Sequence, residues 1–298
     1  NEIGVRLVGS EMCIRDSLLG DARKAKKILN WKPKVSFEEL VKEKLDELVS
    51  FRNTTESMHE FWAKQYDLGL AWVHFPTGSG GLDLNPKFQL MINETLRKEG
   101  ISINNRIANI LGIGMGAPTI AEFGTEEQKN KYLRPMFAAE EIWCQMFSEP
   151  GSGSDLASLS TKAVDDGDGY IVNGQKVWTT LGHLAKWGLL VARTDPNVPK
   201  HRGLTFFIVD MESEGVEVRP LRQITGEAEF NEVYFTDVKI PKENVLGEVG
   251  DGWRVSLAIL MNERVAIGGN VRAVSYTHSD AADDMQCVDL GGRRIIKK

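Results

Sequence analysis

The sequence has few cysteines and no cysteine pattern that could hold a metal ion. Its 298 residues contain three cysteines, Cys13, Cys144 and Cys287, far apart along the chain. None belongs to a Cys-x-x-Cys pair or has the histidine spacing of a zinc site. Because the cysteines are scattered and odd in number, we expect a reducing compartment and no metal.

Long apolar runs and blocks of one charge are also absent. No stretch approaches the roughly 20 apolar residues that span a bilayer, and the N-terminus lacks the order of a secretory signal. The formal charge of -6 is spread along the chain, without a basic run that could neutralise a phosphate backbone. We therefore expect no nucleic-acid or membrane partner and a cytoplasmic protein, whose 42% hydrophobic content allows two or three packed units.

Both ends of the chain differ in pattern from its middle. Residues 1–17 and 274–298 sustain neither a helical nor a strand period, and the strings EMCIRDS and VSYTH within them resemble translated sequencing-adapter residue. We expect both tails to be non-native. Residues 18–49 predict a helix, a turn at Pro33 and a second helix. Residues 18–48 resemble the C-terminal tail of nucleotide-sugar dehydratases, so this segment is either a spliced foreign fragment or a native helix pair.

Three blocks of different patterning follow. In residues 50–139, apolar residues recur at helical spacing, and the string TEEQ from Thr125 offers a helix start. In residues 140–243, β-branched and aromatic segments alternate with turns, and Asn173-Gly174 predicts a type I′ hairpin. Residues 244–273 return to helical spacing after the GDGW turn. The predicted fold class is α+β multidomain: an N-terminal helical domain, a central antiparallel β-barrel domain and the start of a C-terminal helical bundle.

Two short strings indicate a binding site. In CQMFSEPGSGSD, glycines and hydroxyls crowd a turn after a strand-like run, where backbone N–H groups can approach a ligand closely. The string KVWTT ends a strand, and strand alternation places Trp178 and Thr180 on one face, which suits a flat aromatic cofactor. Taken alone, the first string is more often an ordinary turn, and the second is more often a strand whose tryptophan packs in a β-core.

Five strings together resemble the acyl-CoA dehydrogenase family across residues 55–270: FSEPGSGSD, VNGQKVWTT, HRGLTFFIVD, FNEVYFTDVKIPKENVLGEVGDGW and LMNERVAIGG. The resemblance implies FAD as cofactor, an acyl-CoA substrate, an electron-transfer flavoprotein or similar acceptor, and a homodimer or homotetramer. It also implies that the family's last helical segment is missing. It assigns flavin contacts to Gln145, Phe147, Ser148, Gly153, Ser154, Trp178, Thr179 and Thr180. Ser154 would also touch the pantetheine arm of the substrate.

Desaturation needs a carboxylate that removes the α-proton while a hydride leaves the β-carbon. Most family members supply this base from the last helical segment, but in one branch it directly precedes an arginine, as Glu263 precedes Arg264 here. Glu263 flanks an apolar helix face, where loss of hydration makes a carboxylate a stronger base. We predict Glu263 as the base and Arg264 as a substrate-binding residue; the alternatives are a solvated glutamate and a base in the missing segment.

Other candidates are assigned no chemistry. His183 and His201 lie in polar turns without a partnered carboxylate, so we expect them on the surface. Asp251 and Trp253 are interpreted as a helix start and its hydrophobic anchor. Alternative functions are an acyl-CoA oxidase, a flavin monooxygenase, and a non-catalytic FAD- or CoA-binding fragment. A sugar-nucleotide dehydratase is disfavoured because the chain has no GxGxxG string and no Tyr-xxx-Lys pair.

Overall fold

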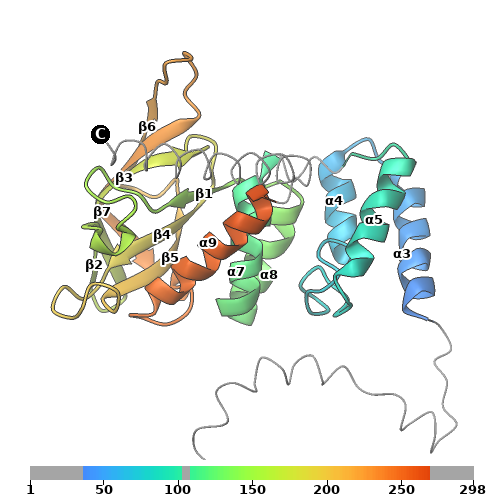
Figure 1. Ribbon diagram of the computed structural model, residues 1–298, viewed down its shortest axis with the longest axis horizontal. Helices are drawn as coiled ribbons and strands as arrows, with labels where there is room; N and C mark the ends of the chain where they lie inside the picture. Colours follow the sequence, from blue (N-terminus) through green and yellow to red (C-terminus); the bar gives the residue numbers. More distant parts are fainter. Residues whose placement is uncertain (1–35, 103–107, 269–298) are drawn as a thin grey trace, which may run out of the picture. The chain divides into compact units, whose positions relative to one another are not determined.

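A computed structural model of the chain describes residues 36–102 and 108–268 (Figure 1). The chain divides into two compact units, Asn1–Glu43 and Lys44–Lys298, and helix α3 (Phe37–Arg52) contains the boundary between them. The predicted tails, and the first helix predicted within residues 18–49, lie outside the described residues. The second helix predicted there corresponds to α3.

Several helical segments follow α3 before the first strand. They are α4 (Met58–Asp67), α5 (Lys87–Lys98), the π-helix η1 (Gly112–Gly116), α7 (Ala117–Phe123) and α8 (Glu126–Phe137). The helix start predicted at Thr125 is confirmed: its side chain accepts a hydrogen bond from Gln128 N, and the Gln128 side chain accepts one from Thr125 N. This reciprocal pair satisfies two backbone donors that a helix otherwise leaves free.

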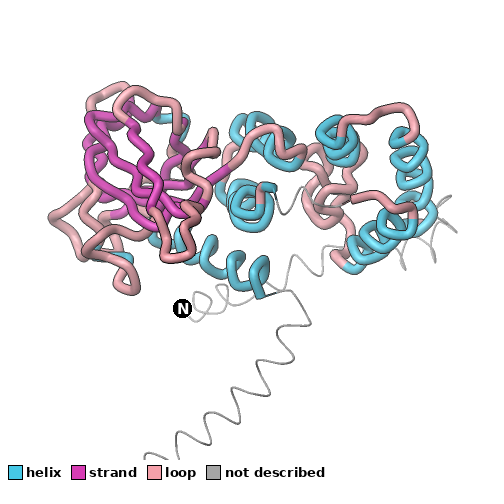
Figure 2. The backbone as a smooth tube through the Cα atoms, turned by 90° about the horizontal axis from the view of Figure 1, so that it is seen from above, coloured by secondary structure: helices cyan, strands magenta, loops and turns pink. Residues whose placement is uncertain are grey.

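Seven strands form one strongly curled sheet (Figure 2). They pair in the order β1-β4-β2-β3-β7-β6, with β5 on the other side of β4. Their bounds are β1 (Trp143–Met146), β2 (Lys162–Asp165), β3 (Gly169–Thr180), β4 (Trp187–Arg193), β5 (Leu204–Asp210), β6 (Val216–Leu221) and β7 (Phe230–Pro241).

The sequence predicted an antiparallel sheet, and this is wrong for two of the strand pairs. Strands β1 and β2 both run parallel to β4. Met146 of β1 pairs with Leu190, and Lys162 of β2 pairs with Arg193 further along the same strand. The chain therefore leaves β4 after β1 and returns to it at β2. The intervening residues 147–161 form a loop instead of a hairpin, and we call them the serine loop.

Helix α9 (Gly252–Gly268) follows the sheet and contacts β5, β4, α7 and η1. The order of helices, curled sheet and a further helix confirms the predicted α+β multidomain class. Strands β4 and β5 supply the most deeply buried side chains of the sheet, because six of the seven residues in each are buried. Within the described ranges, no helix combines the length and apolar character needed to cross a membrane.

The predicted type I′ hairpin at Asn173-Gly174 is wrong. Strand β3 continues through both residues and pairs with β7 on either side of them, with a register shift between Val172 and Gly174. The Asn173 side chain donates to Asp237 Oδ1 and accepts from Asp237 N, each at 2.9 Å. These residues therefore form a β-bulge, which uses the same backbone freedom of Asn-Gly that a turn would use.

We expect Gly174→Ala to lower the free energy of unfolding by about 1–3 kcal/mol, as overpacking does in other cores. A Cβ at this position would lie 2.5 Å from Thr161 Oγ1 and 2.7 Å from Thr161 Cα, and backbone cannot move aside easily. Gly151→Ala is the matched control, because its Cβ would meet no atom within 4 Å. Urea unfolding of both variants checks this, and equal stabilities would contradict the close approach.

Candidate active site

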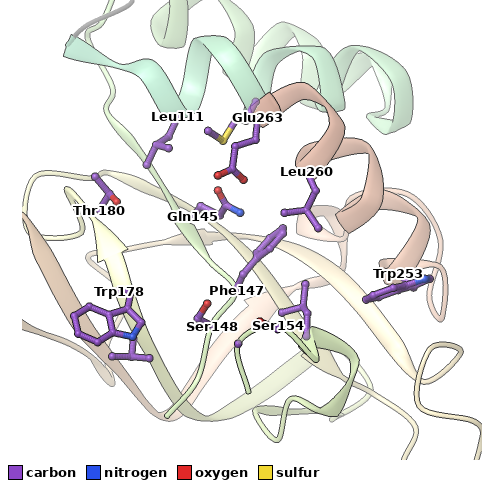
Figure 3. A pocket seen from close by; sticks show the side chains of 14 residues that line it. Leu111, Gln145, Phe147, Ser148, Ser154, Trp178, Thr180, Trp253, Leu260 and Glu263 are labelled. Atoms are coloured by element: carbon purple, nitrogen blue, oxygen red, sulfur yellow. The ribbon is translucent and has the colours of Figure 1, made fainter. Parts of the chain in front are cut away.

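A cavity of about 460 Å³ is bounded by β1, the serine loop, β3, α9 and the segment around η1 (Figure 3). This volume lies within the range of cofactor and small-molecule pockets. Its lining residues are Leu111, Met115, Gln145, Phe147, Ser148, Gly153, Ser154, Leu156, Val177, Trp178, Thr180, Trp253, Leu260 and Glu263.

The cavity collects most of the residues singled out from the sequence. All the predicted flavin contacts except Thr179 line it, and so does the predicted base, Glu263. Thr179 and Arg264 do not. His183 and His201 are exposed and also lie outside the lining, and the His201 ring packs against Trp253 with 4.7 Å between ring centroids.

The first wall comes from β1 and the serine loop. Because side chains alternate along a strand, Cys144 and Met146 point into the core while Gln145 and Phe147 line the cavity. The loop then turns sharply: Glu149 N donates to Ser152 O at 2.8 Å, and Ser152 N donates to Glu149 O at 3.0 Å. This turn brings the residues that follow it, Gly153 and Ser154, to the cavity.

The second wall comes from the end of β3, where a second register shift lies between Lys176 and Thr179. Trp178 has a left-handed backbone (φ 62°), and its side chain is 61% exposed. The irregularity lets both Val177 and Trp178 line the cavity, while Thr179 and Lys176 are both fully buried. Thr179 therefore lies outside the cavity, on the face opposite to Trp178 and Thr180, whereas the irregularity removes Lys176 from the cavity face.

Helix α9 supplies the third wall. Leu260 and Glu263 are separated by three residues, so they share one helix face, and both line the cavity. Arg264 is one position further, which turns it about 100° away; it is exposed, and its guanidinium lies 3.9 Å from Met261 Sδ. This rotation explains why the predicted substrate-binding role of Arg264 finds no support in the cavity lining.

The sequence analysis missed the apolar part of the lining. Leu111 and Met115 come from the π-helical region, and Trp253, interpreted only as a helix anchor, also lines the cavity. A Cβ on Gly114 would lie 2.8 Å from Ala266 Cβ, so this glycine lets α9 approach η1 closely. The helical spacing of Leu111 and Met115 was visible in the sequence, but their association with α9 was not.

The polar lining suits a heteroaromatic ring with carbonyl and ring-nitrogen edges. The side chains of Gln145, Ser148, Ser154 and Thr180 form no hydrogen bond with any residue that the structure describes, so they are available to a ligand. The exposed Trp178 indole adds a flat apolar surface. These residues fit a flavin. Among the described residues, no group of three or more His, Cys, Asp or Glu side chains could hold a metal ion.

A buried ion pair lies behind the cavity wall. Lys176 Nζ is 2.9 Å from Glu149 Oε1, with side-chain exposures of 0% and 4%. Burial alone would raise the pKa of Glu149, but the Lys176 ammonium and hydrogen bonds from Thr161 and Ser160 outweigh it and hold the pKa at about 2. Burial lowers the pKa of Lys176 to about 8, against the opposing effect of Glu149. Both groups are therefore charged at neutral pH.

Comparison with protein families identifies this arrangement. The N-terminal domain of acyl-CoA dehydrogenases matches residues 34–140, and the middle domain of the same family matches residues 144–238. The chain belongs to the acyl-CoA dehydrogenase family. The family consists of oxidoreductases. Its N-terminal domain matches this chain from residue 34 onward, so residues 34–49, which include most of α3, align with the family.

Curated acyl-CoA dehydrogenases are similar over much of the chain. Acyl-CoA dehydrogenase FadE34 of Mycobacterium tuberculosis is 48% identical over 236 residues, which cover 77% of this chain and 32% of the relative. Acyl-CoA dehydrogenase IpdE1 of the same organism is 41% identical over 198 residues, with coverages of 66% and 50%. The chain thus spans about a third to a half of the length of these two relatives.

Two solved structures share the fold, one of which is an acyl-CoA dehydrogenase. The enzyme from Geobacillus kaustophilus superposes with a TM-score of 0.57 at 34% identity, over 76% of this chain and 63% of that one. The ChsE4-ChsE5 complex from Mycobacterium tuberculosis gives a TM-score of 0.56 at 33% identity, over 78% and 62%.

Proposed function

We propose that the protein desaturates an acyl-CoA thioester between its α and β carbons with FAD as cofactor. One observation carries the proposal: a single cavity holds a carboxylate, Glu263, together with the Trp178 indole and the free Ser148 and Thr180 hydroxyls. Membership of the acyl-CoA dehydrogenase family supports the reaction class. Bound FAD would accept the hydride that leaves the β-carbon.

Residues of different cavity walls would bind different parts of the cofactor and the substrate. The Trp178 indole would hold the flavin ring by stacking, and the Ser148 and Thr180 hydroxyls would bond to its polar edges. Gln145 would add an amide beside the ring. Ser154, at the edge of the serine loop, contacts the pantetheine arm of the thioester.

Glu263 removes the α-proton. Its carboxylate is half-buried and lines the cavity beside Leu260. Leu111 and Met115 line the same cavity. The place of the carboxylate in the cavity lining supports this role, because a general base must lie within reach of the proton that it removes.

The electrons pass to an electron-transfer flavoprotein or a similar acceptor, and the protein works as a homo-oligomer. The solved structures with a similar fold include one of the electron transferring flavoprotein of Acidaminococcus fermentans (25% identity, TM-score 0.58), which supports the acceptor. They also include the ChsE4-ChsE5 complex, which supports assembly into an oligomer. An oxidase or monooxygenase differs in passing electrons to oxygen. Oxygen consumption that matches the rate of product formation, with no reduction of an artificial dye, would favour those alternatives.

We expect acid treatment of the purified protein to release FAD, and substrate to bleach the bound flavin. Chromatography of the released cofactor distinguishes FAD from FMN and nicotinamides; either of these in place of FAD would contradict the proposal. An acyl-CoA panel of straight-chain, branched and steroid thioesters tests the substrate. The steroid thioesters are included because two solved structures with the same fold are of a steroid ACAD. A yellow protein that no thioester bleaches would instead indicate a non-catalytic FAD binder.

A further inference from the structure

The Lys176–Glu149 ion pair joins two walls of the cavity from behind. The Lys176 ammonium donates to Glu149 Oε1 at 2.9 Å and to Phe147 O at 3.0 Å. Val177, next to Lys176, lines the cavity, and so do Phe147 and Ser148, next to Glu149. The pair is therefore one peptide unit away from the surface that a ligand touches.

The peptide bond between Phe147 and Ser148 connects the buried ammonium to the cavity, because one of its ends contacts Lys176 and the other belongs to a lining residue. The described chain contains no cis peptide bond, so the Ser148 N–H points opposite to Phe147 O. Because Phe147 O faces the buried ammonium, this N–H faces the side on which Ser148 lines the cavity. No described residue accepts a hydrogen bond from it. Ser148 thus presents two adjacent donors, N–H and Oγ–H, to a bound ring.

We propose that Lys176 is a positioning residue that makes the Ser148 N–H a stronger donor to negative charge developing on a ring bound in the cavity. The inference rests on the proposed function. A hydrogen bond from an ammonium to a carbonyl polarises the peptide, and the low dielectric of the interior screens this effect weakly. A preorganised donor aimed at developing charge stabilises that charge.

Glu149 holds the ammonium in place. Its Oε2 accepts from Ser160 N at 2.6 Å and Ser160 Oγ at 2.7 Å, and its Oε1 accepts from Thr161 N at 2.9 Å. These bonds fix the carboxylate to the far end of the serine loop, so it anchors Lys176 while offsetting only part of its charge. The ammonium is the member of the pair that contacts the Phe147–Ser148 peptide.

A double substitution, Lys176→Met with Glu149→Gln, tests the electrostatic effect without leaving a buried charge unpaired. The measurement is the two-electron reduction potential of bound FAD, by equilibration with a redox dye and without any acyl-CoA. We expect reduced flavin to bind about tenfold less tightly relative to oxidised flavin, which lowers the potential by about 30 mV. Lys186→Met with Asp210→Asn is the matched control: it removes a Lys–carboxylate pair outside the cavity lining and leaves the potential unchanged.

The single substitution Glu149→Gln tests the sign. It removes the counter-charge of the ammonium behind the same peptide. Because Glu149 raises the pKa of Lys176, the potential is measured at mildly acidic pH, where the amine keeps its proton, and there we expect it to rise. A purely structural role would shift the potential in the same direction in both variants, because both loosen the same loop. If the double variant does not fold, the single one decides: a raised potential supports the proposal, and an unchanged or lowered one overturns it.

The other possible results also test the role of Lys176 or the proposed reaction. An unchanged potential in a folded, FAD-loaded double variant overturns the inference, and so does loss of FAD from a folded double variant, which indicates a structural role. Wild-type protein that holds FAD but is bleached by no thioester refutes the proposed reaction, whereas the potential measurement still judges Lys176. Wild-type protein that binds no flavin refutes both.

Discussion

Glu263→Gln should reduce the rate of flavin bleaching by substrate by about 10²–10⁴, the usual contribution of a general base. Glutamine keeps the size and hydrogen-bonding capacity of Glu263 but removes the carboxylate that takes the α-proton. FAD should still bind, because the indole and hydroxyl side chains of the other walls are unchanged. Rapid-mixing spectroscopy of the FAD-loaded variant with an acyl-CoA that bleaches the wild type measures the effect.

Two controls define what the result means. Glu248→Gln makes the same chemical change at an exposed glutamate outside the cavity lining and should leave the rate unchanged. Arg264→Gln alters the next residue of α9, which points away from the cavity, and should have little effect on the bleaching rate. Near-normal bleaching by Glu263→Gln would show that another carboxylate takes the proton, and Glu263 would then be only a wall residue.

The sequence predicted most of the cavity through two short strings and their resemblance to a known family. Strand alternation placed Trp178 and Thr180 on one face, and both line the cavity. The resemblance, and not a local pattern, assigned Gln145, Phe147, Ser148, Gly153 and Ser154, which line the same cavity. The order of helices and strands was predictable from local patterns, which the chain expresses within a few residues.

Two predictions for β3 differ from the structure. The resemblance to the family assigned Thr179 to the flavin, whereas strand alternation places it on the face opposite to Trp178 and Thr180, where it is fully buried. Asn173-Gly174 is a strong turn signal, yet the same backbone freedom serves a bulge when β7 pairs on both sides. A local sequence cannot distinguish these outcomes, because the partner strand that decides between them lies about sixty residues further along.

Contacts across long sequence separations were also invisible. Glu149 and Lys176 both lie within the strings that defined the site, but nothing in either string indicates that they pair. The pairing arises because β1 and β3 bring the serine loop and residue 176 together around one buried position. Polar residues within a binding motif can therefore be buried behind the cavity, where they stabilise its wall, instead of contacting the ligand.

Glu149→Gln alone should lower the free energy of unfolding by about 3–5 kcal/mol, the usual effect of removing one partner from a buried ion pair. The carboxylate is 4% exposed and accepts from Lys176, Ser160 and Thr161. Glutamine can still accept from the backbone donors, so the loss arises mainly from the Lys176 ammonium left without a counter-charge. Urea unfolding at pH 7 measures it.

The double substitution Lys176→Met with Glu149→Gln is the matched comparison. It removes both charges, and a buried pair replaced by neutral side chains of similar size is often nearly neutral for stability. We therefore expect the double variant to be more stable than Glu149→Gln, which gives a favourable coupling energy in the double-mutant cycle. A single variant that loses less than about 1 kcal/mol, the range of exposed pairs, would show that the pair is not held as tightly as its distances indicate.

Acid should remove the same stabilisation from the wild type. The pKa of Glu149 is held at about 2, below its ordinary value of 4.5, so the unfolded chain takes up this proton at a higher pH than the folded chain does. The contribution is present above pH 4.5 and falls by about 3 kcal/mol as the pH drops toward 2. Glu149→Gln lacks this titration, so the difference in stability between the variant and the wild type should shrink across that window. A difference that stays constant from pH 6 to the lowest pH at which both proteins fold would contradict the assignment.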